Sequence, residues 1–206
     1  VAAITGEPGT KVVLTILDSQ TQKSREVPLK REHIKLRTVR GHQRDDSRPK
    51  GWDYMVDPEN KICYVRVGGF MDKTVKDLEV ALKQMKAEGC RGLILDLRFN
   101  PGGLLTSAIN MCELFMKEGN QIVSTKGRTR QQNMEINARN YGAFNNVPLI
   151  ILVNEYSASA SEIVAGALAG LKEACIVGTR SFGKGSVQNL IPIADNAAYL
   201  KLTTAH

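Results

Sequence analysis

The alternation of predicted strands and helices after residue 61 constrains the fold of this chain more than any other feature. Apolar runs typical of strands alternate with segments of helical periodicity; the strands are expected at 62–67, 92–97, 147–153 and 174–177, and the helices at 75–85, 103–117 and 160–171. Strands that are separated by helices usually pair in parallel, because the chain must cross the sheet between them. The sequence therefore predicts an α/β fold.

The segments outside this pattern are predicted to be β-rich. Residues 11–17 and 26–36 read as two strands near the N-terminus, and residues 186–193 and 197–203 as a hairpin around Asp195 and Asn196. Between them, residues 41–53 are polar and contain proline and glycine, which is typical of a linker.

Composition excludes several classes of protein. With 42% hydrophobic and 24% charged residues, the chain has the composition of an ordinary globular protein. The longest apolar run, 147–153, is far shorter than the roughly 20 residues of a membrane helix, so no membrane span is expected. The net charge of +7 lies mostly in the first 50 residues, where basic and apolar residues alternate. This pattern favours a solvated face, and we expect no nucleic-acid partner.

The cysteines and the chain ends carry no specific signal. The four cysteines form no CxxC pair and have no histidine at ligand spacing, which favours buried free thiols and predicts neither a metal nor another cofactor. The chain contains no targeting segment, and both of its ends look like cut ends inside structural elements.

Three glycine- or serine-rich segments follow predicted strands, at 96–103 (DLRFNPGG), 154–162 (NEYSASASE) and 178–185 (GTRSFGKG). Open α/β sheets bind ligands at this end of their strands. The third segment matches the first seven positions of a nucleotide-binding P-loop. Its eighth position is Gly185, however, and the residues that follow read as a strand, so nucleotide binding is not favoured.

The same segments contain the parts of an acyl-transfer site. Ser157, Ser159 and Ser161 open a predicted helix, although Ser159 and Glu162 also form an ordinary capping box. A nucleophilic serine needs a base, and the histidines lie outside this part of the chain. A lysine in water has a pKa of about 10.4, so a lysine base must be buried or kept away from acids. Lys184, with no acid nearby in sequence, suits that role best.

Backbone N–H groups for an oxyanion could come from Gly102 and Gly103, which precede a predicted helix. A glycine turn that serves chain geometry alone gives the same pattern. Spacing does not choose among the three serines, nor between the two glycines.

Taken together, the three segments resemble the carboxyl-terminal processing proteases, also called tail-specific proteases. DLRFNPGG, SASASE and GKGSVQ occur in the family's order, and Lys184 lies 25 positions after Ser159. The resemblance implies that Ser159 is the nucleophile, that Lys184 is its base and that Gln188 assists the lysine. It also implies that Ala160 and Gly102 or Gly103 donate to the oxyanion. Many members carry an aspartate where this chain has Gly170, so we expect a Ser-Lys dyad.

The resemblance also implies a domain organisation. Residues 1–38 resemble the C-terminal part of a PDZ domain, residues 39–60 would form a linker and first strand region, and residues 61–206 a ClpP/crotonase-like protease core that is truncated at its C-terminus. The half of the PDZ domain that captures a terminal carboxylate is missing, so we expect the remnant to bind C-terminal peptides weakly.

The expected function is a serine endopeptidase that cleaves unfolded or precursor proteins near an apolar C-terminus. The family resemblance suggests a bacterial cell envelope or periplasm, protein or peptide substrates and a possible homo-oligomer. Two alternatives stay open. One is a catalytically inactive fragment of the same fold that binds peptides or apolar ligands, and the other is a crotonase-like acyl-CoA enzyme.

Overall fold

The computed structural model describes residues 4–34, 36–48, 51–140, 142–171, 174–193 and 198–206. By its internal contacts the chain divides into an N-terminal unit, Val1–Leu36, and an α/β unit, Arg37–His206. The position of one unit relative to the other is not determined, so each is described by itself.

The N-terminal unit contains one antiparallel hairpin of β1 (Lys11–Leu17) and β2 (Ser24–Lys30), paired from Lys11↔Lys30 to Leu17↔Ser24. The second strand is shifted from the expected 26–36 and ends at Lys30. Apolar side chains such as Val13 and Leu29 are about half exposed. An isolated two-stranded hairpin is only marginally stable in water. The PDZ assignment of these residues stays a prediction.

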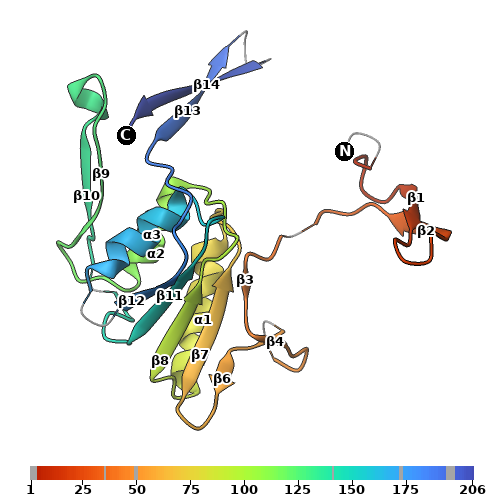
Figure 1. The fold of residues 1–206 in the computed structure, drawn as a ribbon, viewed down its shortest axis with the longest axis horizontal. Coiled ribbons are helices and arrows are strands. Elements are labelled where there is room, and N and C mark those ends of the chain that lie inside the picture. Colours follow the sequence, from red (N-terminus) through yellow and green to blue (C-terminus); the bar gives the residue numbers. More distant parts are fainter. Residues whose placement is uncertain (1–3, 35, 49–50, 141, 172–173, 194–197) are drawn as a thin grey trace. The chain divides into compact units, whose positions relative to one another are not determined.

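A six-stranded mixed sheet forms the centre of the α/β unit (Figure 1). Four strands run parallel in the order β12-β11-β8-β7, and the two short strands β3 and β6 both pair antiparallel with β7. Their bounds are β3 Val39–Arg40, β6 Met55–Asp57, β7 Ile62–Val67, β8 Gly92–Asp96, β11 Leu149–Val153 and β12 Ala174–Gly178. The predicted α/β fold is therefore confirmed. The segment expected to contain a linker contributes β3 and β6 to this sheet.

Three helices join the parallel strands and pack beside one another, α2 against both α1 and α3. They are α1 (Thr74–Ala87), α2 (Leu105–Glu113) and α3 (Ala160–Ala169). Each buries an apolar stripe; in α1 it consists of Leu78, Ala81, Leu82 and Met85. Gly89, with φ +84°, ends this helix as the sequence predicts.

The sheet buries one face more completely than the other. In β7 the side chains of Cys63, Val65 and Val67 are buried while the intervening residues are half-buried. In β11 Ile151 is buried and its neighbour Ile150 is 41% exposed. Ile94 of β8 lies on the same less covered face: it is only half-buried and lies in register with Ile150.

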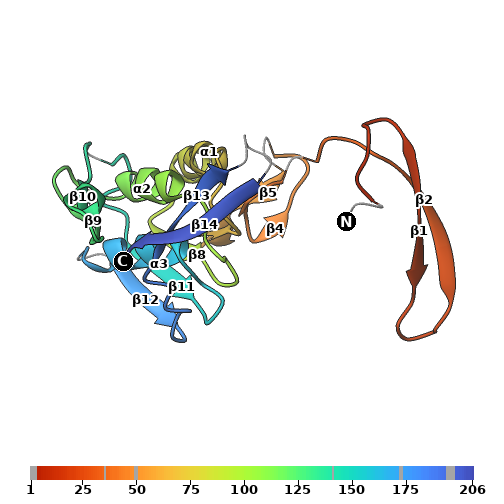
Figure 2. The ribbon, with the colours of Figure 1, turned by 90° about the horizontal axis from the view of Figure 1, so that it is seen from above.

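Three two-stranded antiparallel pairs lie outside the central sheet: β4 (Gln43–Arg44) with β5 (Trp52–Asp53), β9 (Gln121–Thr125) with β10 (Met134–Asn137), and β13 (Val187–Ile193) with β14 (Ala198–Ala205). Figure 2 shows β13 and β14 as long neighbouring arrows. A bridge between Gly127 and Ala205 links the loop between β9 and β10 to β14. The turn predicted at Asp195 and Asn196 lies outside the described residues.

One element differs from the sequence expectation. The second helix is shorter than the expected 103–117: after Glu113 the N–H groups of Leu114 and Phe115 bond three residues back, to Met111 and Cys112, in turns that end the α-helix. The mostly exposed segment that follows β9 contains β10 and a short 3-10 helix, Arg130–Gln132. No helix in the described residues combines the length and hydropathy needed to cross a bilayer.

Candidate active site

The three segments singled out in the sequence follow β8, β11 and β12, which are neighbours in the sheet and run in the same direction. Their loops therefore emerge at one edge of the sheet, where α/β folds place their ligands. We call them the glycine loop (97–104), the serine loop (154–159) and the lysine loop (179–185). Hydrogen bonds connect the serine loop to both of the others.

Asn100 holds the glycine loop against the sheet and the serine loop. Its fully buried side chain donates to the Val67 carbonyl (2.8 Å) and accepts from the Gly102 N–H (2.9 Å). Its backbone carbonyl accepts from the Ala158 N–H (3.0 Å) and the Ser161 hydroxyl (2.9 Å). One buried asparagine thus connects β7, the glycine loop and the start of α3.

The end of β8 is fixed by a buried carboxylate. Asp96 accepts a hydrogen bond from the Tyr64 hydroxyl (2.6 Å) and forms a bidentate pair with the Arg98 guanidinium. Burial acts to raise the pKa of Asp96, but the bonds from Arg98 and Tyr64 outweigh it and the pKa is lowered overall. Burial and the bond to Asp96 raise the pKa of Tyr64 to about 12. Asp96 is therefore an anion at neutral pH, directly before the glycine loop.

The structure separates the three candidate serines. Ser157 is fully buried, donates to the Leu97 carbonyl (2.9 Å) and accepts from the Asn154 N–H (2.9 Å). Ser161 is also fully buried and donates to the Asn100 carbonyl. Both hydroxyls are therefore used to hold the loops together. Ser159 alone is only partly buried.

Ser159 has a strained backbone, with φ +57° and ψ −112° at the N-cap of α3. A positive φ is rare for residues with a side chain, and such strain concentrates at functional sites. Gly102 lies directly against this turn: a Cβ there would be 2.9 Å from the Ser159 Cβ and 2.9 Å from the Ala160 nitrogen. A side chain at Gly102 would therefore fill the space beside the Ala160 N–H.

Backbone donors near Ser159 fall into two groups. The Ser159 N–H is bonded to Glu162 Oε2 (2.8 Å), and the Gly102 N–H to Asn100 Oδ1. By contrast, the N–H groups of Gly103 and Ala160 have no acceptor within the described part of the chain. Ala160 is the first residue of α3, where N–H groups lack helical acceptors. These two donors are available to a ligand.

Glu162 joins the serine loop to the lysine loop. Its Oε2 accepts from the N–H groups of Ser159 and Lys184 (2.9 Å), and its Oε1 accepts from the Ser181 hydroxyl (2.8 Å) and the Gly183 N–H (2.6 Å). Burial acts to raise the pKa of Glu162, but these four bonds outweigh it and lower the pKa overall. The carboxylate therefore stays ionised at neutral pH and holds the Lys184 backbone near that of Ser159.

Comparison with known proteins identifies the family. Residues 61–206 match the model of peptidase family S41. The chain belongs to this family. The carboxy-terminal-processing protease of Bartonella bacilliformis is 41% identical over 204 residues, covering 97% of this chain and 43% of that protein. The carboxyl-terminal-processing protease of Synechocystis is 37% identical over 196 residues, covering 95% and 43%. The resemblance inferred from the sequence motifs is thus confirmed.

A solved structure supports the same fold. The photosystem II D1 C-terminal processing protease matches with a TM-score of 0.66 and 27% identity, over 97% of this chain and 51% of that one. The chain spans less than half the length of the two curated relatives, so the activity of the whole protein is a proposal.

The S41 site residues predicted from the sequence are only partly brought together. Gly102, Ser159 and Ala160 are in contact, and Lys184 is tied to them through Glu162. The Lys184 side chain is half-buried and, among the described residues, forms no ion pair.

Gln188 and Gly170 lie apart from this cluster. Gln188 is exposed in β13, where its Nε2 donates to Thr203 Oγ1 at 3.4 Å. Within the described residues it has no hydrogen bond to Lys184. Gly170 caps the C-terminal end of α3, at the opposite end of the helix from Ser159.

The sequence does not predict the structural role of Asn100 or the wider role of Glu162. Asn100 lies inside the DLRFNPGG motif, and the sequence predicts Glu162 only as one half of a capping box with Ser159. The capping bond to the Ser159 N–H is present, but three further donors come from the lysine loop. These donors lie 19 to 22 positions later in the chain, so no local pattern links them to Glu162.

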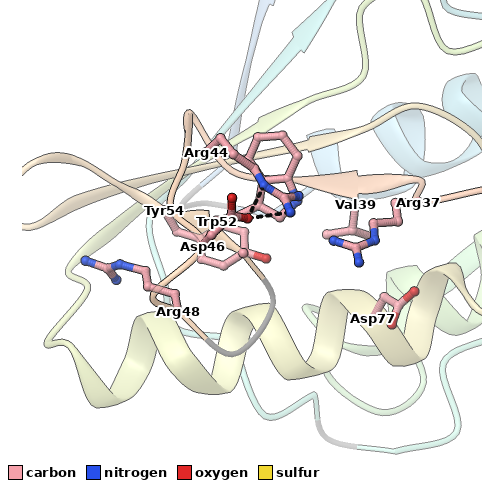
Figure 3. A pocket seen from close by; sticks show the side chains of 9 residues that line it. Arg37, Val39, Arg44, Asp46, Arg48, Trp52, Tyr54 and Asp77 are labelled. Carbon is pink, nitrogen blue, oxygen red and sulfur yellow. Dashed lines mark hydrogen bonds and ion pairs between the residues drawn. The ribbon is translucent and has the colours of Figure 1, made fainter.

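A cavity of about 420 Å³ is lined by residues from the segment 37–54 and by Asp77 of α1 (Figure 3). Arg44 pairs there with Asp46 and lies over the Trp52 ring at 5.4 Å. Arg48, which also lines it, pairs with Asp45, Asp53 and Glu88. No residue of the predicted site lines this cavity. Of its charged lining residues, Arg44 and Asp46 pair with each other, and Arg48 pairs with residues outside the lining.

The cysteines are less uniform than the expected four buried thiols. Cys63 and Cys112 are buried and Cys90 is half-buried, but Cys175 is exposed. The expectation is wrong at Cys175 because β12 is the edge strand of the sheet. Among the described residues, histidine, cysteine and acidic side chains form no group that could hold a metal ion.

Proposed function

We propose that this chain carries the catalytic centre of a serine endopeptidase of family S41 that cleaves protein substrates near their C-terminus. Ser159 is the nucleophile and Lys184 the general base. One observation carries the proposal: the single partly exposed serine of SASASE lies beside Gly102 and the free N–H of Ala160 and is tied through Glu162 to the backbone of Lys184. The names of the curated relatives support cleavage at a C-terminus.

Ser159 Oγ attacks the carbonyl carbon of the scissile bond and its proton passes to Lys184 Nζ. The N–H groups of Gly103 and Ala160 stabilise the oxyanion that forms. Lys184 then protonates the leaving amine and afterwards activates the water that hydrolyses the acyl-enzyme.

Gly103, rather than Gly102, is the better oxyanion donor. The Gly102 N–H is already bonded to Asn100 Oδ1, and the absence of a Gly102 side chain keeps the space beside the Ala160 N–H open. The two glycines therefore have different tasks, one as donor and one as spacer.

The remaining proposals about the whole protein rest on the resemblance to the carboxyl-terminal processing proteases. They are a preference for an apolar C-terminus, assistance to the lysine by Gln188 and a location in a bacterial envelope. Substrate would lie extended along a sheet edge, where main-chain hydrogen bonds give affinity.

The proposal is tested by following cleavage of a loosely folded protein by mass spectrometry. Ser159→Ala and Lys184→Ala should each lower the rate by about 10³-fold or more, as loss of a nucleophile or base does. Ser124→Ala and Lys117→Ala, which change exposed residues outside the three loops, should leave the rate near that of the wild type.

Equal cleavage by all five proteins would mean that a contaminant is responsible. Binding of the substrate without cleavage would favour the non-catalytic alternative, and turnover of an acyl-CoA thioester would favour the crotonase-like one.

A further inference from the structure

We propose that Glu162 is a positioning residue of the active site, whose carboxylate holds the backbone of the lysine loop close to that of Ser159. The inference rests on the proposed function and adds to it a residue that touches neither the substrate nor the reacting atoms. Glu162 would act on the reaction through Lys184.

The arrangement of donors around the carboxylate carries this inference. Each oxygen accepts two hydrogen bonds, and Oε2 joins the two loops directly because it accepts from both Ser159 N–H (2.8 Å) and Lys184 N–H (2.9 Å). Oε1 accepts from Ser181 and Gly183, which precede Lys184. Three of the four donors therefore come from the lysine loop.

Helix capping alone does not account for this pattern. A glutamate at this position of a capping box needs one bond, to the N–H of the N-cap residue. Glu162 makes that bond and uses its remaining acceptor capacity outside the helix. Hydrogen bonds to an ionised acceptor are about twice as strong as neutral ones, so this carboxylate is a stronger tether than an ordinary cap.

Among the described residues, few other bonds hold the lysine loop in place. The Phe182 N–H donates to the Ser157 carbonyl (3.0 Å), the Thr179 hydroxyl donates to the exposed Glu155 (3.1 Å), and Nδ1 of His206 lies 3.3 Å from the Gly185 carbonyl. Phe182 itself is 67% exposed. A cavity of about 380 Å³, lined in part by Glu162 and Ser181, adjoins the loop. The position of the loop therefore depends on hydrogen bonds, of which Glu162 receives more than any other residue.

Replacing the Glu162 carboxylate by an amide removes hydrogen-bond acceptors while leaving the size of the side chain unchanged. In Glu162→Gln one oxygen becomes an NH₂ group, which cannot accept from a backbone N–H. Whichever way the amide is turned, at least one lysine-loop N–H, that of Gly183 or that of Lys184, loses its acceptor. The side chain keeps its length and can still cap α3 in one of the two orientations.

The first readout is catalytic. A misplacement of about 1 Å in a catalytic group can cost about 10²-fold in rate. We therefore expect Glu162→Gln to lower kcat by about 10- to 100-fold while KM changes by less than about threefold. Ser181→Ala, which removes a single donor, should lower kcat by a smaller factor. Glu155→Gln removes the same charge from a neighbouring carboxylate, but an amide can still bond the Thr179 hydroxyl, so kcat should stay near the wild-type value.

The second readout does not depend on activity. Hydrogen exchange followed by mass spectrometry should show faster exchange of residues 179–188 in Glu162→Gln and unchanged exchange in Glu155→Gln and Ser159→Ala. Unchanged exchange and kcat in both Glu162→Gln and Ser181→Ala would overturn the inference. A rise in KM with constant kcat would also overturn it, because that result indicates a substrate-binding role.

The two proposals can fail separately. If the wild type does not cleave, or if Ser159→Ala still cleaves, the proposed function fails while the exchange of residues 179–188 still reports on the tether. If Glu162→Gln does not fold, Ser181→Ala carries the test, since it leaves the carboxylate and the helix cap in place.

Discussion

The two sides of the candidate site are held by different means. On the side of the nucleophile, the glycine and serine loops are joined by buried neutral groups, Asn100, Ser157 and Ser161. On the side of the base, the lysine loop is joined to the serine loop mainly by one half-buried carboxylate, Glu162. The first arrangement is part of the core, whereas the second lies at its surface.

This difference separates stability from activity. Groups that bond only to the interior contribute to the free energy of unfolding, because their loss leaves buried donors and acceptors unpaired. Regions held by exposed hydrogen bonds open at lower free energy than the core does. We therefore expect substitutions of the buried groups on the nucleophile side to lower the free energy of unfolding. Substitutions on the base side should lower the rate of catalysis with little loss of stability.

Asn100→Ala should have the largest effect on stability. The change leaves the Val67 carbonyl and the Gly102 N–H without their partner in a fully buried place. At about 1–3 kcal/mol for each unpaired group, the free energy of unfolding should fall by about 3 kcal/mol. Urea denaturation measures this loss. Asn110→Ala, on the exposed face of α2, is the matched control and should cost less than about 0.5 kcal/mol. Equal losses at both positions would contradict the proposed difference between the two sides.

The sequence predicts the central layers well because their pattern is local. The parallel strands β7, β8, β11 and β12 are apolar runs, and the periodicity of α1 and its closing Gly89 are visible in sequence. β10 is missed because it has only four residues, two of them polar, within a segment rich in Arg, Asn and Gln; it is a strand because it pairs with β9, as Ile136 does with Val123. Pairing between distant segments leaves no periodic signal.

The candidate site also depends on contacts between segments that are distant in the sequence. The motif and its resemblance point to Ser159, but spacing alone leaves Ser157 and Ser161 as equal candidates. The structure distinguishes them through bonds to Leu97 and Asn100, about 60 positions earlier in the chain. The order of the loops at the sheet edge, set by the strand order, brings these distant partners together.

The three serines allow the same chemical change at two structural positions and at the proposed nucleophile, all on the nucleophile side. Ser157→Ala removes a hydroxyl with two buried bonds and should cost about 1–3 kcal/mol, and Ser161→Ala, with one bond, should cost about 1 kcal/mol. Ser159→Ala, which removes the hydroxyl of the N-cap residue of α3, should cost about 0.5–1 kcal/mol. Cleavage should show the reverse order, abolished by the change at Ser159 and retained by the folded fraction of the others. A large loss of stability at Ser159 would mean that its hydroxyl, too, is structural.

Acid pH should release the lysine loop before the glycine loop, and this is the smallest of the expected effects. The folded-state pKa of Glu162 lies below its usual value of 4.5, so the ionised form stabilises the fold. That contribution is complete above pH 4.5 and is lost as the pH falls through the lower folded-state value. The Gly102 N–H, by contrast, is bonded to the neutral amide of Asn100.

Hydrogen exchange between pH 3.5 and 6, corrected for the intrinsic rate, tests this contrast. Protection of residues 179–188 should fall as the pH drops below 4.5, and protection around Gly102 should stay constant over the range in which the protein remains folded. Asp96 is an internal reference for this experiment. Because its pKa is lowered and its side chain is completely buried, the end of β8 should stay fixed until the pH falls below the usual pKa of an aspartate. In Glu162→Gln, protection of residues 179–188 should be low at every pH. If the two loops lost protection together in the wild type, a single cooperative opening would describe the site, and the carboxylate would not be a separate tether.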